Sequence, residues 1–160
     1  MGLKEYQSEV IELLAQHEET VAEIYKAYAE KLPDKKHFWT VLHLEELDHA
    51  AWIRRLKQKV EEGFIYFNEE RFKTETIRTS LDYLKEILSK VKKEKVNLKH
   101  ALSTGMDIES SLIESKFYEV YETDDHEFRQ LLSALAGAFK EHHDRLKDAL
   151  EKTKKWDDAT

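Results

Sequence analysis

The sequence predicts an all-α protein that is built from long helices. The chain of 160 residues contains only four glycines and one proline, and 37 % of its residues are charged. β-sheet proteins of this size need more turn-forming residues than these. Apolar residues recur at helical spacing in four long segments, and a shorter segment of the same kind lies between the second and the third. This pattern predicts four long helices and one additional short helix.

The first two long helices are predicted over residues 3–32 and 34–62. Pro33 breaks the pattern because it lacks a backbone N–H, and Asp34 is a candidate N-cap for the helix that follows. Gly63 is a candidate C-terminal stop for the second helix. Because the connection between the two helices is tight, we expect an antiparallel hairpin.

The rest of the chain predicts a crossover and a second pair of long helices. Residues 63–73 show no clear period and are predicted to form a loop, and a shorter amphipathic helix follows over about 75–93. Long helices are then predicted over about 98–122 and 126–152, with a tight turn between them. The long connection lets the third long helix start at the far end of the second. We therefore expect an up-down-down-up bundle with one long crossover.

A single domain accounts for nearly all of the chain. The length suits one domain that buries its own core. We therefore assign residues 1–155 to one helical bundle domain and residues 156–160 to a short, frayed tail.

Charge and composition disfavour several classes of function. The net charge of −7 argues against nucleic acid as a partner, because phosphate contacts need a basic face. No apolar run approaches the ~20 residues of a membrane span, and the start of the chain lacks the apolar stretch of a signal peptide. We therefore expect no membrane partner and a cytoplasmic location. The absence of cysteine excludes disulfides, thiol nucleophiles and Cys-ligated metals, so any metal must be held by histidine and carboxylate.

Each of the four long helices carries an acid or an imidazole on its apolar face. In chain order, these residues are Glu18, Glu46, His49, Glu109, Glu114 and His142. Burying a charge is unfavourable unless the charge is paired or bound to a metal. Because all four helices contribute, a metal site between them explains the set better than chance does. Glu114 lies towards one edge of its face, so for this residue the sequence leaves open a ligand or an edge position.

The second long helix carries the strongest local motif. Glu46 and His49 have the spacing Glu-x-x-His, which places both side chains on one side of a helix, where they can grip one ion. Glu45, which precedes Glu46, and His17, which precedes Glu18, are interpreted as supporting or interface residues rather than ligands. Taken singly, an inward histidine such as His142 is also explained as a hydrogen-bonded core residue.

Two stretches of the chain resemble the rubrerythrin-like proteins of the ferritin-like superfamily. Residues 18–56 resemble the first helical hairpin of this family, with Glu18, a tyrosine seven residues later, and a Glu-Glu-x-x-His run that ends at His49. Residues 101–146 resemble the second hairpin. The acids and the imidazole that fall near the family's metal positions in this hairpin are Glu109, Glu114 and His142.

This resemblance implies a ferritin-like four-helix bundle with a carboxylate-bridged di-iron centre. Such centres react with oxygen or hydrogen peroxide, or oxidise ferrous iron, so the chain would be an oxidoreductase of the peroxidase or ferroxidase type. The implied ligands are Glu18, Glu46, His49, Glu109, Glu114 and His142. Glu46 or Glu114 would bridge the ions, and Tyr25 would support the ligands. A homodimer is a further expectation from the family.

The sequence departs from the family pattern in two ways. Because it has no cysteine, it lacks a rubredoxin-like iron module, and electrons would come from a separate donor. The last long helix also lacks the Glu-x-x-His motif, because Phe139 stands three residues before His142 and Ala138 stands four before it. We therefore predict an asymmetric site that holds one ion well near Glu46 and His49 and a second ion weakly. Iron is the expected metal, with manganese and zinc as alternatives.

Two other functions stay open at this point. The first is a non-catalytic bundle that keeps the fold, has a degenerate metal site and acts through partners. The incomplete motif on the last helix supports this alternative. The second is an iron-sequestering protein, which is less favoured because the sequence identifies no surface that would form a cage.

Overall fold

Nearly all of the residues that the structure describes lie in helices. The computed structural model describes residues 3–63, 66–67, 74–111, 121–122 and 126–159. The α-helices among them are α1 (Leu3–Lys31), α2 (Lys36–Glu61), α3 (Thr74–Lys93), α4 (Leu98–Glu109) and α6 (His126–Ala159). The prediction of an all-α protein is confirmed. Within these ranges, no helix combines the length and the apolarity needed to cross a membrane.

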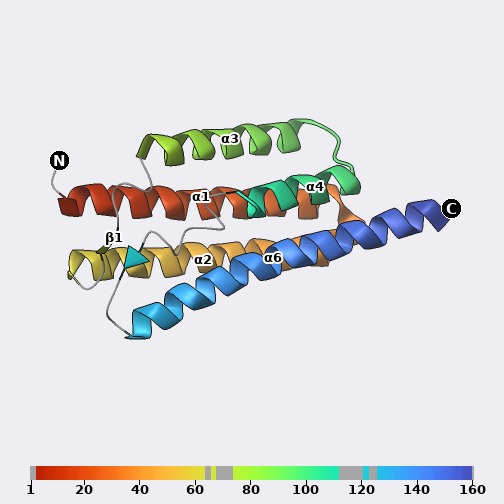
Figure 1. Cartoon of the computed structure of the whole chain (residues 1–160). Helices are drawn as coiled ribbons and strands as arrows, with labels where there is room; N and C mark the ends of the chain where they lie inside the picture. The colour runs from red at the N-terminus through yellow and green to blue at the C-terminus, as the bar shows by residue number, and fades with distance from the viewer. Residues whose placement is uncertain (1–2, 64–65, 68–73, 112–120, 123–125, 160) are drawn as a thin grey trace.

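The helices lie roughly along one common direction (Figure 1). A single 3₁₀ turn, Pro33–Lys35, joins α1 to α2, and the two helices run antiparallel. Helix α3 packs on α1 and carries the chain back to the end at which α2 starts. Helix α4 starts from that end, and α6 packs against α4 and runs in the opposite direction. The hairpin predicted for the first two helices is therefore confirmed.

The third long helix ends earlier than the sequence predicts. Helix α4 stops at Glu109, where the Ser110 N–H donates to the carbonyl of Met106 at 2.9 Å. Consecutive serines after this point favour the end of a helix, because their hydroxyls compete for backbone hydrogen bonds. The prediction of a helix up to residue 122 is wrong at its end, where β2 (Tyr121–Glu122) pairs antiparallel with β1 (Tyr66–Phe67). The intervening residues 112–120 lie outside the described residues.

The last helix is longer than predicted. Helix α6 continues through Ala159, so the prediction that the last helix ends near residue 152 is wrong. No proline or glycine follows Gly137 in this helix, and the lysines of its last part favour a helix. A Lys152–Asp148 ion pair of 2.9 Å, one turn apart, adds a small stabilisation.

The apolar core is divided into two clusters by a layer of buried polar side chains. The first cluster contains Val10 and Leu14 of α1 and Leu56 of α2, and it includes Phe139 of α6. The second cluster gathers apolar residues from the other halves of α1 and α2 and from α4, together with Leu146 of α6. The buried acids and imidazoles that lie between these positions along α1, α2 and α6 are His17, Glu18, Glu46, His49 and His142. The layer is therefore held by apolar packing on both sides.

Helix α4 packs closely on α6 at Gly105. A Cβ atom built on Gly105 would lie 3.0 Å from Cδ2 of Leu146, which is fully buried. Gly137 of α6 has no atom within 4 Å of such a Cβ, and it therefore offers a matched control.

We expect Gly105→Val to lower the free energy of unfolding by about 1–3 kcal/mol, because the added atoms overpack the α4–α6 contact. Gly137→Ala should raise it by roughly 0.5–1 kcal/mol, because alanine favours a helix. Urea denaturation followed by circular dichroism measures both changes. Equal stability of Gly105→Val and the parent protein would contradict the close packing of the two helices.

Candidate metal centre

Five of the six predicted ligands are buried in the polar layer. Glu46 and His142 are 0 % and 1 % exposed, and Glu18, His49 and Glu109 are each 3 % exposed. Their predicted positions on the buried faces of the helices are therefore confirmed. The sixth, Glu114, lies outside the described residues. Metal binding by these residues stays a prediction.

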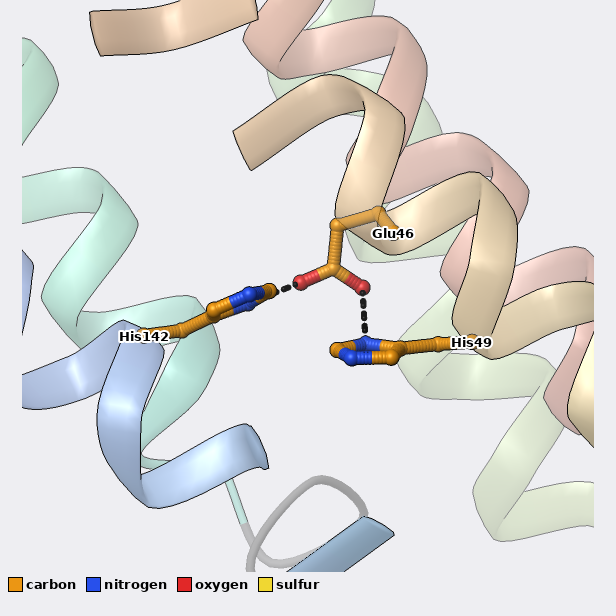
Figure 2. A group of neighbouring side chains, drawn as sticks. All are labelled: Glu46, His49 and His142. Carbon is orange, nitrogen blue, oxygen red and sulfur yellow. Dashed lines mark hydrogen bonds and ion pairs between the residues drawn. The ribbon is translucent and has the colours of Figure 1, made fainter. Parts of the chain in front are cut away.

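Glu46 lies between the two imidazoles at the centre of the layer, as Figure 2 shows. Its Oε2 is 3.2 Å from Nδ1 of His49, one turn later on α2. Its Oε1 is 2.8 Å from Nδ1 of His142, which reaches across from α6. The two rings are tilted by 30° with their centroids 4.9 Å apart. One carboxylate thus links the Glu-x-x-His motif of α2 to the histidine of α6.

Two further carboxylates flank this central group. Oε2 of Glu18, on α1, is 4.0 Å from Nδ1 of His49. On α4, Oε1 of Glu109 is 3.5 Å from Nδ1 of His142 and accepts a 2.8 Å hydrogen bond from the Tyr25 hydroxyl. Tyr25 therefore contacts one of the predicted ligands directly, as its predicted supporting role requires. The other carboxylate oxygen of Glu109 is buried and has no hydrogen-bond partner within the described part of the chain.

The central group has the composition of a metal site. Glu46, His49 and His142 each offer one ligand atom, and the three atoms lie within 4.8 Å of one another. Donors bonded to one ion at about 2 Å lie no more than about 4 Å apart, so a small rotation of the rings would bring them into range. Imidazole nitrogens and carboxylate oxygens suit iron, manganese and zinc. The residues therefore fit a divalent transition metal.

Phe139 occupies the position where the family pattern has a second glutamate. Its ring is buried, and it meets the His49 imidazole edge to face, with centroids 5.2 Å apart and an interplanar angle of 86°. A phenyl ring offers neither a charge nor a lone pair to an ion. The side of the site next to α6 is therefore apolar at this level of the bundle.

Sequence reasoning missed the contact of His142 with Glu45 and Arg145. Nε2 of His142 is 2.7 Å from Oε2 of Glu45, and the same oxygen accepts a short hydrogen bond from the guanidinium of Arg145. Arg145 follows His142 by three residues, so both side chains leave α6 on the same side. This spacing, together with the position of Glu45 next to Glu46, is the sequence feature that could have predicted the contact. Glu45 therefore supports the site directly.

Both ring nitrogens of His142 face carboxylates, and this arrangement is the one expected of a protonated imidazole. A carboxylate can only accept, so the hydrogen bonds to Glu46 and Glu45 each need a proton on the ring. Burial lowers the pKa of His142, but the hydrogen bond and charge of Glu109 and the charge of Glu45 outweigh it and raise the pKa above 6.5. Burial likewise raises the pKa of Glu45, but Arg145 and His142 outweigh it and hold the pKa below 4.5. Both shifts favour the ion pair of a protonated His142 with an ionised Glu45.

The remaining inward histidine serves another contact. His17 is 1 % exposed, and its Nε2 lies 3.2 Å from the Ser80 hydroxyl of α3. This contact ties α1 to the crossover helix. The interpretation of His17 as an interface residue agrees with this position.

Comparison of the chain with protein-family models, with curated proteins and with solved structures gives no match. The function is therefore argued from the geometry of this centre.

The pKa of His142 predicts how stability depends on pH in metal-free protein. A group whose pKa rises on folding stabilises the fold below its unfolded pKa, and this contribution is lost as the pH rises through the folded value. For His142, we expect the free energy of unfolding to fall as the pH rises above 6.5, and His142→Gln should remove this part of the slope. Urea denaturation at a series of pH values in the presence of chelator measures it.

His37→Gln, a substitution of an exposed histidine at the start of α2, serves as the control and should behave as the parent protein. Identical pH slopes for the parent protein and His142→Gln would contradict the ion pair.

Proposed function

We propose that this chain is a ferritin-like metal-binding protein that holds one divalent ion, preferentially iron, in its helical core. In this proposal α1, α2, α4 and α6 form the four-helix bundle, and α3 lies in the long crossover. Glu46, His49 and His142 hold the ion. Glu18 and Glu109 stand on either side as further carboxylate ligands.

One observation carries this proposal: three buried donor atoms on two helices converge within 4.8 Å. A lone buried histidine is explained by a hydrogen bond, but three converging ligand groups flanked by two more buried acids are not. The Glu109 oxygen without a hydrogen-bond partner among the described residues supports the same reading. Buried polar atoms are normally satisfied, and an ion would satisfy this one.

The stoichiometry of one ion follows from the asymmetry of the layer. The Glu46–His49 half has a carboxylate from α1 beside it, in Glu18. The His142 half has Glu109 from α4, but the apolar ring of Phe139 stands where the resemblance leads us to expect a second Glu-x-x-His glutamate. Two dications close together need enough anionic ligands to offset their charge. We therefore propose that a second position is weak or empty.

The proposed activity is redox chemistry on peroxide, oxygen or ferrous iron. Bound iron would supply the electron transfer, and a separate donor would return the electrons, because the chain has no cysteine for a second iron module. The residues of the chain have other tasks. Tyr25 orients Glu109 through its 2.8 Å hydrogen bond, and Arg145 positions Glu45 against His142. The apolar clusters on both sides of the layer exclude water.

A non-catalytic bundle is the second candidate, and one observation favours it. Both oxygens of Glu46 and both nitrogens of His142 already have partners without a metal. Such a layer is stable as a set of hydrogen bonds and ion pairs. In that case the protein would act through partner proteins. Metal titration separates the two candidates.

We expect metal-free protein to bind about one equivalent of ferrous iron when titrated without oxygen. Phe139→Glu should move the stoichiometry towards two, because the new carboxylate completes the ligands of a second ion. Phe139→Leu keeps the position apolar and serves as the control, which should stay at one. Tight binding of two equivalents by the parent protein would refute the asymmetry, and no binding at all would favour the non-catalytic bundle.

Metal should also raise the melting temperature, because a ligand that binds only the folded state stabilises it. His49→Ala should abolish this rise while the protein stays helical. His17→Ala removes an equally buried histidine outside the central group and should keep the rise. Differential scanning calorimetry with added iron, manganese or zinc measures the effect. Equal rises for His49→Ala and the parent protein would place the ion elsewhere.

A further inference from the structure

A second feature of the molecule is a cavity of about 730 Å³ at the end of the bundle where α2 and α4 begin. It is lined by the start of α2, the start of α4 and the C-terminal half of α6, which lie together at that end in Figure 1. This volume lies in the range of about 300–1,000 Å³ that is typical of small-molecule sites. Arg145 is part of the lining, but Glu46, His49 and His142 are not. The cavity therefore contains none of these three candidate ligands, although Arg145 also belongs to the contacts around His142.

Part of the cavity lining is apolar. Phe38 of α2, Leu98 and Leu102 of α4, and Ala149 of α6 line it. Leu102 is buried, but Phe38, Leu98 and Ala149 are only half-buried, although they pack against the second core cluster. Apolar surface of this kind gains free energy when a ligand removes it from water. The lining therefore suits the apolar body of a small molecule.

The rim of the cavity carries three basic side chains. Lys35, Arg145 and Lys152 line it together with one acid, Asp148, and Arg145 is also paired with Glu45 and Glu141. Lys152 pairs with Asp148 at 2.9 Å. The Lys35 side chain is exposed, and it makes no ion pair or hydrogen bond with the other residues that the structure describes. Arg145 and Lys152 have acidic partners, whereas Lys35 has none among the described residues, and its charge favours an anionic ligand.

Arg145 indicates the kind of anion. Its guanidinium already binds the carboxylate of Glu45 and lies 3.4 Å from that of Glu141. The planar fork of a guanidinium matches a carboxylate with two parallel hydrogen bonds. A carboxylate that enters the cavity would meet this group and the Lys35 ammonium together.

We propose that this cavity binds an amphipathic monocarboxylate, a molecule with one carboxylate on an apolar chain or ring. The apolar body lies against Phe38, Leu98 and Ala149, and the carboxylate lies at the rim between Lys35 and Arg145. This site does not depend on the metal, so its test uses protein treated with chelator.

Isothermal titration calorimetry with octanoate tests the proposal, with octylammonium as a probe of equal length and opposite charge. We expect octanoate to bind in about the millimolar range or tighter, as suits so small a ligand, and octylammonium not to bind. Lys35→Gln should weaken octanoate binding about two- to fivefold, the usual effect of one exposed charge. Lys36→Gln, which removes the neighbouring exposed lysine outside the cavity lining, should leave binding unchanged.

Ala149→Phe places a ring in the cavity and should abolish octanoate binding, and an unchanged circular dichroism spectrum checks that the variant folds. Equal binding of octanoate and octylammonium would overturn the charge selection. Absence of octanoate binding, or binding that Ala149→Phe leaves intact, would overturn the site. Sedimentation at the same concentrations measures whether a second copy of the chain occupies the surface instead. If the protein forms a dimer that Ala149→Phe disrupts, and octanoate does not bind, the surface is a dimer interface.

Discussion

The burial of Glu46 is the constraint on which the rest of the structure depends. Its carboxylate is fully buried, and an unpaired charge at that depth would destabilise the fold strongly. Two imidazoles compensate it, one from the next turn of α2 and one from α6. The second contact fixes the position of α6 along α2, because a shift by one turn would leave His142 opposite a different residue. The polar layer thus determines how the last helix docks.

The same layer organises the apolar core. Along α1, α2 and α6, apolar residues lie before and after the buried acids and imidazoles, so the core consists of two clusters rather than one. Phe139 and Leu146 belong to different clusters, and His142 stands between them on α6. Each cluster packs against one side of the layer and keeps water from it. The low dielectric that results strengthens the ion pairs inside.

The sequence allows prediction of features that depend on one helix at a time. Periodicity gave the hairpin of α1 and α2 and the buried faces that carry Glu18 and Glu109. The contact of Arg145 and Glu45 with His142 depends on the register of α6 against α2, which no single-helix pattern contains. The early end of α4 was missed for a different reason. The apolar period continues past residue 109 and predicts a longer helix, although Ser110 and Ser111, which follow, are weak helix formers.

The contacts of the layer also bear on how a metal would enter it. In a small zinc domain the unfolded chain gains its structure from the ion, because its ligands have no other partners. Here Glu46 and His142 already bond to each other, and the apolar clusters hold the helices on both sides. Folding therefore does not require the ion. In the proposed site, metal binding would instead be an exchange, in which the ion replaces the protons that His49 and His142 share with Glu46. The ion can displace these protons only if its bond to imidazole is stronger than the hydrogen bond between imidazole and carboxylate. This condition favours a transition metal over calcium or magnesium.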